Sequence, residues 1–276
     1  MRRLTLETPE GVWHANADRV HDLSIPLRFD SEQPNHFGAP PASATSLRGG
    51  DFVGDVAAGG SCNCARYHLT PHCNGTHTEC VGHVTRQRVS IRDVYDGGVQ
   101  RALLLTVAAT PAIASREDSD PKPQAEDRLI TAEALKAAWL PWSATHVTAL
   151  ALRTLPNDAG KLTRIYADPP PPYLTRQAVE LLVARGIEHV LLDLPSLDRA
   201  HDEGRLTGHR IFWGLPAGST DVTAAQRGEA TVTEMMYAPD EVADGRYLLD
   251  LQVAPFAADA APSRPLLYPA VDAVAR

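Results

Sequence analysis

The segment from residue 72 to residue 83 concentrates side chains that bind metal ions. It holds three histidines and one glutamate: His72, His77, His83 and Glu79. An Asn-Gly pair between the first two histidines is typical of a turn. Neutral imidazole and carboxylate are common ligands of zinc, manganese and similar divalent ions. We therefore predict a metal site in this segment, and a catalytic one.

The spacing of these residues suits ligands that converge. In an extended chain residues two apart share a face, so His77 and Glu79 are expected to point at the same ion. After a bend His83 would reach that ion or a neighbouring one, and His72 would approach from the other side of the turn. The alternative is a turn-rich loop of surface histidines, which fits a single histidine better than three with a glutamate.

The four cysteines offer competing kinds of site. Cys64, Cys73 and Cys80 are candidates for a structural zinc site, although Cys62 is too close to Cys64 for a zinc knuckle and no second close pair follows. Cys73 or Cys80 is also a candidate nucleophile. Small buried thiols are the remaining alternative, and a disulfide framework is not expected.

Two residues far from this segment are further candidates. His209 lies in an expected helix beside aromatic residues, where a histidine is equally typical of packing or of the surface. Glu234 lies in the apolar stretch 230–237, and a carboxylate there is costly to bury unless a cation compensates it. Glu234 is thus a candidate ligand of a second ion, or a charge on an edge strand facing water.

Asp193 and Asp198 lie at the end of an expected strand, which is where ligand sites of α/β sheets gather. A helix N-cap and a turn explain the two aspartates equally well. Three aromatic residues are candidates for either a substrate pocket or the core: Phe37, Trp213 and Tyr237.

The elements that must position these residues alternate between strands and helices. Hydrophobic patterning predicts strands over 2–7, 11–15, 22–27, 101–108, 146–154, 187–194 and 246–255, with an extended stretch over 66–70. It predicts helices over 131–140 with Thr131 as N-cap, over 175–185 ended by Gly186, and over 202–213. Residues 28–60 and 116–124 are expected to be loops. This order predicts an α/β fold in a single domain, residues 1–276.

Composition excludes several classes of function. The chain has 276 residues, of which 43% are hydrophobic and 22% charged, and a formal net charge of -8. We expect no nucleic-acid partner, because there is no cluster of basic residues. No apolar run has the length of a membrane span, and the charged N-terminus lacks the apolar core of a secretory signal. A cytoplasmic protein is expected.

Residues 72–83 resemble the signature of the metal-dependent cyclase/hydrolase family that includes bacterial kynurenine formamidase and isatin hydrolase. There a histidine is followed by Gly-Thr-His, an aspartate and a further histidine; Gly75-Thr76-His77, Glu79 and His83 correspond to these. Asp22-Leu23-Ser24 resembles the family's N-terminal Asp-Leu-Ser, and residues 193–198 resemble its Asp-Thr-Pro-Ser-Leu-Asp stretch. The motif-bearing core is then about residues 20–256.

The resemblance implies the family's swivelling β/β/α fold and a homodimer. It also implies that His209 transfers a proton, and that one or two divalent ions, zinc or manganese, are bound by these ligands: His72, His77, Glu79, His83 and Glu234.

The chain departs from the family pattern at three positions. Cys73 occupies the place of the first histidine, so the first ligand is either this thiol or His72; we favour His72, since Thr70-Pro71 precedes it. Glu79 replaces the usual aspartate, which places the carboxylate about one methylene farther from the backbone. Val81-Gly82 stand where the family has a proline before its final histidine.

The predicted function is hydrolysis of a linear or cyclic amide by a metal-activated water, most like the hydrolysis of an aryl formamide of the N-formylkynurenine type. Two alternatives remain open at this point. One is a non-catalytic protein that binds a metal or small ligand on the same fold. The other is a metal-dependent lyase or dehydratase.

Overall fold

Strands dominate the computed structural model, which describes residues 2–271. They are β1 (Arg3–Thr8), β2 (Gly11–Asn16), β3 (His21–Asp22), β4 (Asn35–His36), β5 (Ser43–Ser46), β6 (Arg48–Gly49), β7 (Phe52–Val53), β8 (Ala65–His68), β9 (His77–Glu79), β10 (Val99–Ala108), β11 (Thr110–Pro111), β12 (Arg128–Ile130), β13 (Ala149–Leu155), β14 (Ile165–Tyr166), β15 (Tyr173–Leu174), β16 (His189–Leu192), β17 (Thr231–Glu234), β18 (Gly245–Val253) and β19 (Ala260–Val271). The α-helices are α1 (Ile91–Val94), α2 (Ala132–Trp139), α3 (Arg176–Ala184) and α4 (Thr207–Trp213). Short 3-10 helices are η1 (Val81–Val84), η2 (Ala112–Ala114), η3 (Leu140–Trp142), η4 (Ala159–Leu162) and η5 (Val222–Ala224).

Seven strands close into a barrel. Around it, β10, β13, β16 and β17 pair in parallel, and β18, β19 and β9 complete the ring through antiparallel pairs. The short strand β9 closes it, because it pairs with β17 on one side and with β19 on the other. This confirms the predicted α/β fold, with few helices.

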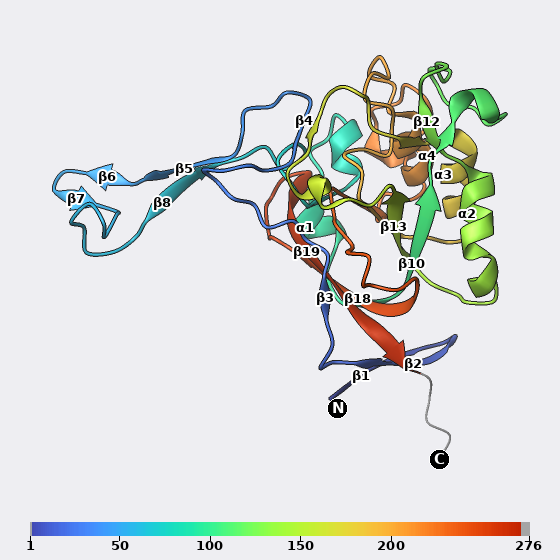
Figure 1. Ribbon diagram of the computed structural model, residues 1–276, viewed down its shortest axis with the longest axis horizontal. Coiled ribbons are helices and arrows are strands. Elements are labelled where there is room, and N and C mark those ends of the chain that lie inside the picture. Colours follow the sequence, from blue (N-terminus) through green and yellow to red (C-terminus); the bar gives the residue numbers. More distant parts are fainter. Residues whose placement is uncertain (1, 272–276) are drawn as a thin grey trace.

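The barrel has an apolar interior and an apolar outer face under the helices. Successive residues of a strand point to opposite faces. On β10, Leu104 belongs to the buried cluster that also holds Leu249, whereas Leu103 and Leu105 belong to the cluster that holds the side chains of α2, α3 and α4. Figure 1 shows these helices together on one side of β10 and β13. The core is therefore two layers that share one sheet.

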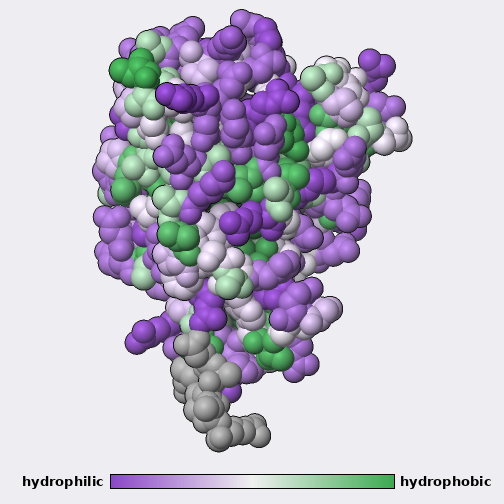
Figure 2. All heavy atoms as spheres, turned by 90° about the vertical axis from the view of Figure 1, so that its right-hand side faces the viewer, coloured by the Kyte–Doolittle hydropathy of each residue, from purple (hydrophilic) through white to green (hydrophobic). Residues whose placement is uncertain are grey.

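Helices α2 and α3 begin where the sequence predicts. The hydroxyl of Thr131 accepts from the backbone N–H of Ala134, and Thr175 caps α3 in the same way. Gly186, at a φ of 73°, follows the end of α3. The outward side of these helices is largely hydrophilic, with hydrophobic residues scattered among polar ones (Figure 2). No helix within residues 2–271 is long and apolar enough to cross a membrane.

A long arm, residues 43–68, projects from the barrel (Figure 1, left). It consists of the pairs β5–β8 and β6–β7, and all four residues of β8 are exposed. Below the barrel in Figure 1, the hairpin β1–β2 extends the sheet by pairing with the end of β19.

Several predicted element bounds are wrong. The expected strand 22–27 is limited to β3, and the expected loop 28–60 contains β4 to β7. The expected helix 202–213 begins at Thr207, because residues 201–204 form a turn. A strand ending at residue 255 was expected to be the last, but β19 follows it and is the longest strand described; its three prolines (262, 265 and 269) are atypical of a strand.

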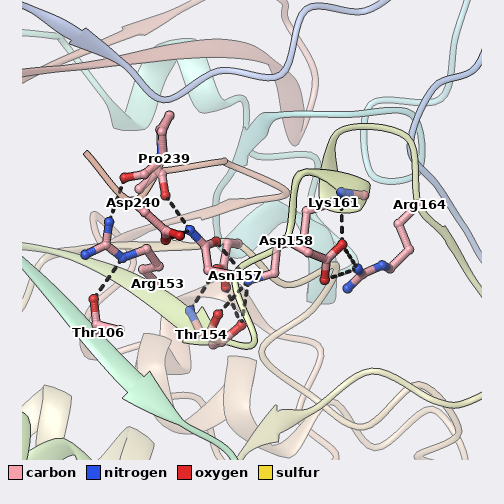
Figure 3. A network of polar contacts seen from close by, with 12 residues as sticks. Thr106, Arg153, Thr154, Asn157, Asp158, Lys161, Arg164, Pro239 and Asp240 are labelled. Carbon is pink, nitrogen blue, oxygen red and sulfur yellow. Dashed lines mark hydrogen bonds and ion pairs between the residues drawn. The ribbon is translucent and has the colours of Figure 1, made fainter. Parts of the chain in front are cut away.

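A polar network ties the ends of the parallel strands to the following loops (Figure 3). Arg153 of β13 donates to the hydroxyl of Thr106 at 2.8 Å and to the carbonyl of Pro239 at 2.7 Å. Lys161 is buried and donates to the Asp193 carboxylate at 2.6 Å. Burial raises the pKa of Asp193, and Lys161 opposes that effect. Asp193 is therefore paired with a lysine and does not face the candidate ligands.

Candidate metal centre

A tight turn and two strand neighbours position the 72–83 segment. The Asn74 side chain accepts from the backbone N–H of Thr70 at 2.6 Å, and Gly75 adopts a φ of 136°, a conformation that favours glycine. The chain then enters β9, whose register places His77 opposite Glu234 of β17. Backbone pairing thus brings together two candidate ligands that lie far apart in sequence.

Glu79 is the centre of the cluster. Its Oε2 lies 2.8 Å from Nδ1 of His72, and its Oε1 lies 2.8 Å from Nε2 of His209. Nδ1 of His83 is farther from it, at 3.9 Å. Each carboxylate oxygen therefore faces one imidazole nitrogen.

Glu234 forms the second carboxylate of the cluster. Its Oε2 lies 3.3 Å from Nε2 of His77, and its Oε1 lies 3.4 Å from Nε2 of His209. The backbone N–H of Leu197 donates to Oε1 at 3.0 Å and fixes the carboxylate. Glu234 is buried and faces the histidines, so the alternative of an edge-strand charge facing water is wrong.

Two of the histidines are oriented through their second nitrogen. Nδ1 of His77 donates to the carbonyl of Gly75 at 2.9 Å, which leaves Nε2 as the free acceptor. Nδ1 of His209 lies 2.6 Å from the Asp198 carboxylate, which also accepts from the backbone N–H groups of Gly208 and His209. Such outer partners hold metal-binding imidazoles in one orientation. Asp198 therefore supports both the start of α4 and the ring of His209.

The cluster contains buried polar atoms without hydrogen-bond partners. These are Nε2 of His77, Nε2 of His209 and both oxygens of Glu79. The nitrogen–oxygen separations are short, but the groups are not aligned for hydrogen bonds. Buried polar atoms are normally satisfied, and leaving them unpaired is costly. A divalent cation between imidazole nitrogens and carboxylate oxygens would satisfy all of them, so the residues present fit a metal ion.

The charges of the cluster support the same conclusion. Burial opposes the charged form of Glu79, but the positive charges of His83 and His209 outweigh it and hold the pKa of Glu79 well below its usual range. Burial likewise opposes charging of His209, yet Glu79 and Asp198 raise its pKa well above the ordinary value. The buried carboxylates thus favour positive charge beside them, which a bound cation would supply.

The potential ligand atoms fall into three overlapping groups. One joins His72, His77 and Glu79, and another joins Glu79, His209 and Glu234. A third joins His72 and His83 to Asp259, a residue that sequence reasoning missed. Among the described residues no such group contains a cysteine, so the cysteine zinc site is not formed.

The cysteines lie in two different settings. Cys62 is exposed and Cys64 half-buried, both on the arm, whereas Cys73 and Cys80 are buried. His72, the residue before Cys73, supplies the ring that faces Glu79.

A second residue missed from the sequence is His36. It is buried, neither ring nitrogen has a hydrogen-bond partner, and its backbone N–H donates to the carbonyl of Cys73 at 3.1 Å. Burial lowers the pKa of His36. Left-handed backbone at non-glycine residues adjoins this region: Phe37 follows His36, and Met235 follows Glu234. Such conformations are enriched at functional sites.

The three aromatic pocket candidates have different positions. Trp213 is fully buried and donates to the carbonyl of Ala230, so it belongs to the core. Phe37 is 64% exposed, and Tyr237 is half-buried. A cavity of about 670 Å³ opens beside His72, between the base of the arm and the loop before β19. Its lining includes Tyr67, Phe256, Pro40, Leu69 and Asp259.

Comparison with known proteins gives a match to one protein family. Residues 21–199 match the sequence model of the Cyclase family, described as "Putative cyclase". A search of curated proteins found no match.

Solved structures share the fold at low identity. Isatin hydrolase A from Ralstonia solanacearum is 18% identical, with a TM-score of 0.59 and 91% of each chain covered. A "predicted metal-dependent hydrolase" from Bacillus stearothermophilus is 16% identical, with a TM-score of 0.55, and the match covers 91% of this chain and 98% of that one. Isatin hydrolase A from Labrenzia aggregata, bound to benzyl benzoate, is 16% identical, with a TM-score of 0.58 and coverage of 91% and 93%. The family match spans most of the chain and includes residues 72–83: the chain belongs to the Cyclase family.

Proposed function

We propose that this protein is a metal-dependent hydrolase that cleaves a linear or cyclic amide, most like an aryl formamide. One observation carries the proposal: buried imidazole nitrogens and carboxylate oxygens converge on Glu79 without hydrogen bonds that would satisfy them. The family match and the fold shared with isatin hydrolases support it.

The ligands we propose form two adjoining positions that share Glu79. His72 and His77 belong to the first, and His209 and Glu234 belong to the second. Zinc or manganese suits this set of ligands, because it contains imidazole and carboxylate only. When bound, the metal would polarise the substrate carbonyl and make a water nucleophilic near neutral pH.

The geometry favours exchanging the roles that the sequence suggests for His209 and His83. Both ring nitrogens of His209 face carboxylates, and its side chain is only 2% exposed, which suits a ligand. The side chain of His83 is 27% exposed, and its ring stacks on that of His72 at 4.2 Å. A group that passes a proton to a leaving nitrogen must reach the substrate. We therefore propose His83 as the proton carrier. Its Nδ1 lies toward Glu79 and Asp259, which leaves Nε2 for the substrate.

The cavity beside His72 is the proposed substrate site. Tyr67, Phe256 and Leu69 give it apolar walls, whereas Asp259 and His72 give it one polar end. A small molecule with a flat apolar group and a carbonyl fits this division. Two isatin hydrolases of the same fold were solved with benzyl benzoate and with the product analogue thioisatinate, which supports a small-molecule substrate here.

The test combines metal removal with two histidine variants. Protein stripped with a chelator should lose hydrolysis of N-formyl aryl amides and of isatin, and Zn²⁺ or Mn²⁺ should restore it. His83→Ala should lose most of the rate and keep its metal by elemental analysis, whereas His209→Ala should lose metal. His14→Ala, on the β1–β2 hairpin and outside the lining of this cavity, is the matched control. Full activity in the chelator, or no bound metal, would refute the proposal.

The same test separates the alternatives. Metal binding without turnover on any amide indicates a binding protein, and turnover on hydroxy acids alone indicates a lyase or dehydratase.

We also propose a cytoplasmic homodimer. Four free cysteines suit a reducing compartment, and the arm exposes Phe52 and Tyr67 as contact side chains. Light scattering on the purified protein measures the dimer directly.

A further inference from the structure

Backbone pairing places Asp259 beside the candidate metal centre. It lies immediately before β19, where Ala260 pairs with Glu79, and its carbonyl accepts from the backbone N–H of Cys80 at 3.0 Å. Its carboxylate Oδ2 lies 3.0 Å from Nε2 of His72 and 3.6 Å from Nδ1 of His83. A residue 187 positions from His72 thus contacts its ring.

The contacts made by the two ring nitrogens of His72 are the same in kind as those made by His209. Each ring directs one nitrogen at Glu79, 2.8 Å away in both cases, and the two nitrogens approach different oxygens. Each ring holds a carboxylate on its other nitrogen: Asp198 at 2.6 Å for His209, and Asp259 at 3.0 Å for His72. Carboxylates in this position fix the orientation of a metal-binding histidine and increase its basicity.

We propose that Asp259 is a positioning residue of the metal centre, which holds Nε2 of His72 so that Nδ1 serves as the ligand beside Glu79. This inference rests on the proposed function, since it concerns the same metal. It also explains how His72 replaces the residue at the next position, Cys73, as the first ligand.

His72 needs such a partner more than the other histidines do. Its side chain is 24% exposed and borders the cavity, so packing restrains only part of the ring. His77, in contrast, is buried and donates to the carbonyl of Gly75. Without Asp259, the ring of His72 could rotate toward the cavity and move Nδ1 away from Glu79.

The experiment measures metal affinity and not only activity. Zn²⁺ affinity is determined by competition with a chromogenic chelator for the wild type, Asp259→Asn and Asp259→Ala. Loss of an outer-shell partner typically costs about 10–100-fold in metal affinity. We expect that loss for Asp259→Ala and a smaller one for Asp259→Asn, because the amide oxygen still accepts from Nε2. Asp250→Asn removes the same charge from β18 of the same hairpin and should bind Zn²⁺ like the wild type.

A double variant tests whether Asp259 acts through His72. In a His72→Ala background, replacing Asp259 should have no further effect on affinity. The Co²⁺-substituted Asp259→Ala protein should also show shifted d–d absorption bands, which a merely structural loop residue would not cause. Far-UV circular dichroism confirms that each variant is folded.

The outcomes separate this inference from the proposed function. If the wild type binds no Zn²⁺, the metal centre itself is refuted. If the wild type binds Zn²⁺ and Asp259→Ala binds it equally well, only the role of Asp259 is refuted. An effect that persists in the His72→Ala background also overturns the positioning role, because Asp259 would then act independently of His72.

Discussion

His189 should make the fold sensitive to acid independently of the metal centre. It lies at the start of β16, is 6% exposed, and its Nδ1 contacts the hydroxyl of Thr231 at 2.9 Å. Burial lowers the pKa of His189 from 6.5 to about 4. The folded protein therefore keeps this ring neutral at a pH where the unfolded chain already protonates it. The contribution of this group to the free energy of unfolding is therefore complete at a pH above 6.5, the pKa in the unfolded chain. It is lost as the pH falls from 6.5 toward 4.

The size of the effect follows from the two pKa values. At about 1.36 kcal/mol per pH unit, the interval from 6.5 to about 4 corresponds to about 3.4 kcal/mol, fully lost below pH 4. Between about pH 7 and pH 5 the loss from this one group is about 2 kcal/mol. His189→Asn removes the titrating ring and keeps a polar atom near the Thr231 hydroxyl. From pH 7 to pH 5, the free energy of unfolding of the His189→Asn variant should therefore fall by about 2 kcal/mol less than that of the wild type.

The assay is urea unfolding of metal-stripped protein at a series of pH values. The slope of stability against pH is compared, so any constant cost of the smaller side chain cancels. His68→Asn, at an exposed position of the arm, controls for the loss of an imidazole. If His189→Asn and the wild type lose stability in parallel between pH 7 and pH 5, the buried neutral ring is not the cause and the reasoning is refuted.

Three further perturbations have defined outcomes. Thr76→Val should destabilise the fold by about 2 kcal/mol or more in urea, because the hydroxyl accepts from one buried backbone N–H at 2.8 Å and donates to one buried carbonyl at 2.6 Å; an unchanged midpoint contradicts this. Lys161→Met should cost about 3–5 kcal/mol, because Asp193 would be left buried and unpaired. Arg164→Met, at an exposed pair, should cost less than about 1 kcal/mol and is its control. Zn²⁺ at about a hundredfold excess over its Kd should stabilise the protein by about 2.7 kcal/mol in thermal unfolding, and no shift would count against the metal centre.

Local features of the chain were predictable because neighbouring residues determine them. Thr131 and Thr175 cap their helices, and Gly186 ends α3, since each effect acts within one helical turn. His77 and Glu79 share one ligand group, as expected for alternate residues of a strand.

Features that depend on long-range pairing were not predictable. β19 was missed because three prolines interrupt its pattern, and with it the position of Asp259. The strands of the arm were not predicted, because they lie in a glycine-rich segment, bury little surface and so lack an apolar periodicity. His36 carries no signal in sequence; only the fold shows that its ring is buried without partners.

The shortest strand of the barrel has a consequence for how the centre forms. β9 has three residues, two of which are candidate ligands, and it is the seam at which the ring of strands is joined. Its neighbours on either side lead to Glu234 and to Asp259. A barrel in which β9 is not paired with β17 therefore cannot hold the complete set of candidate ligands. An ion bound there would link β9 to β17. Metal occupancy and the pairing of these two strands would therefore depend on each other.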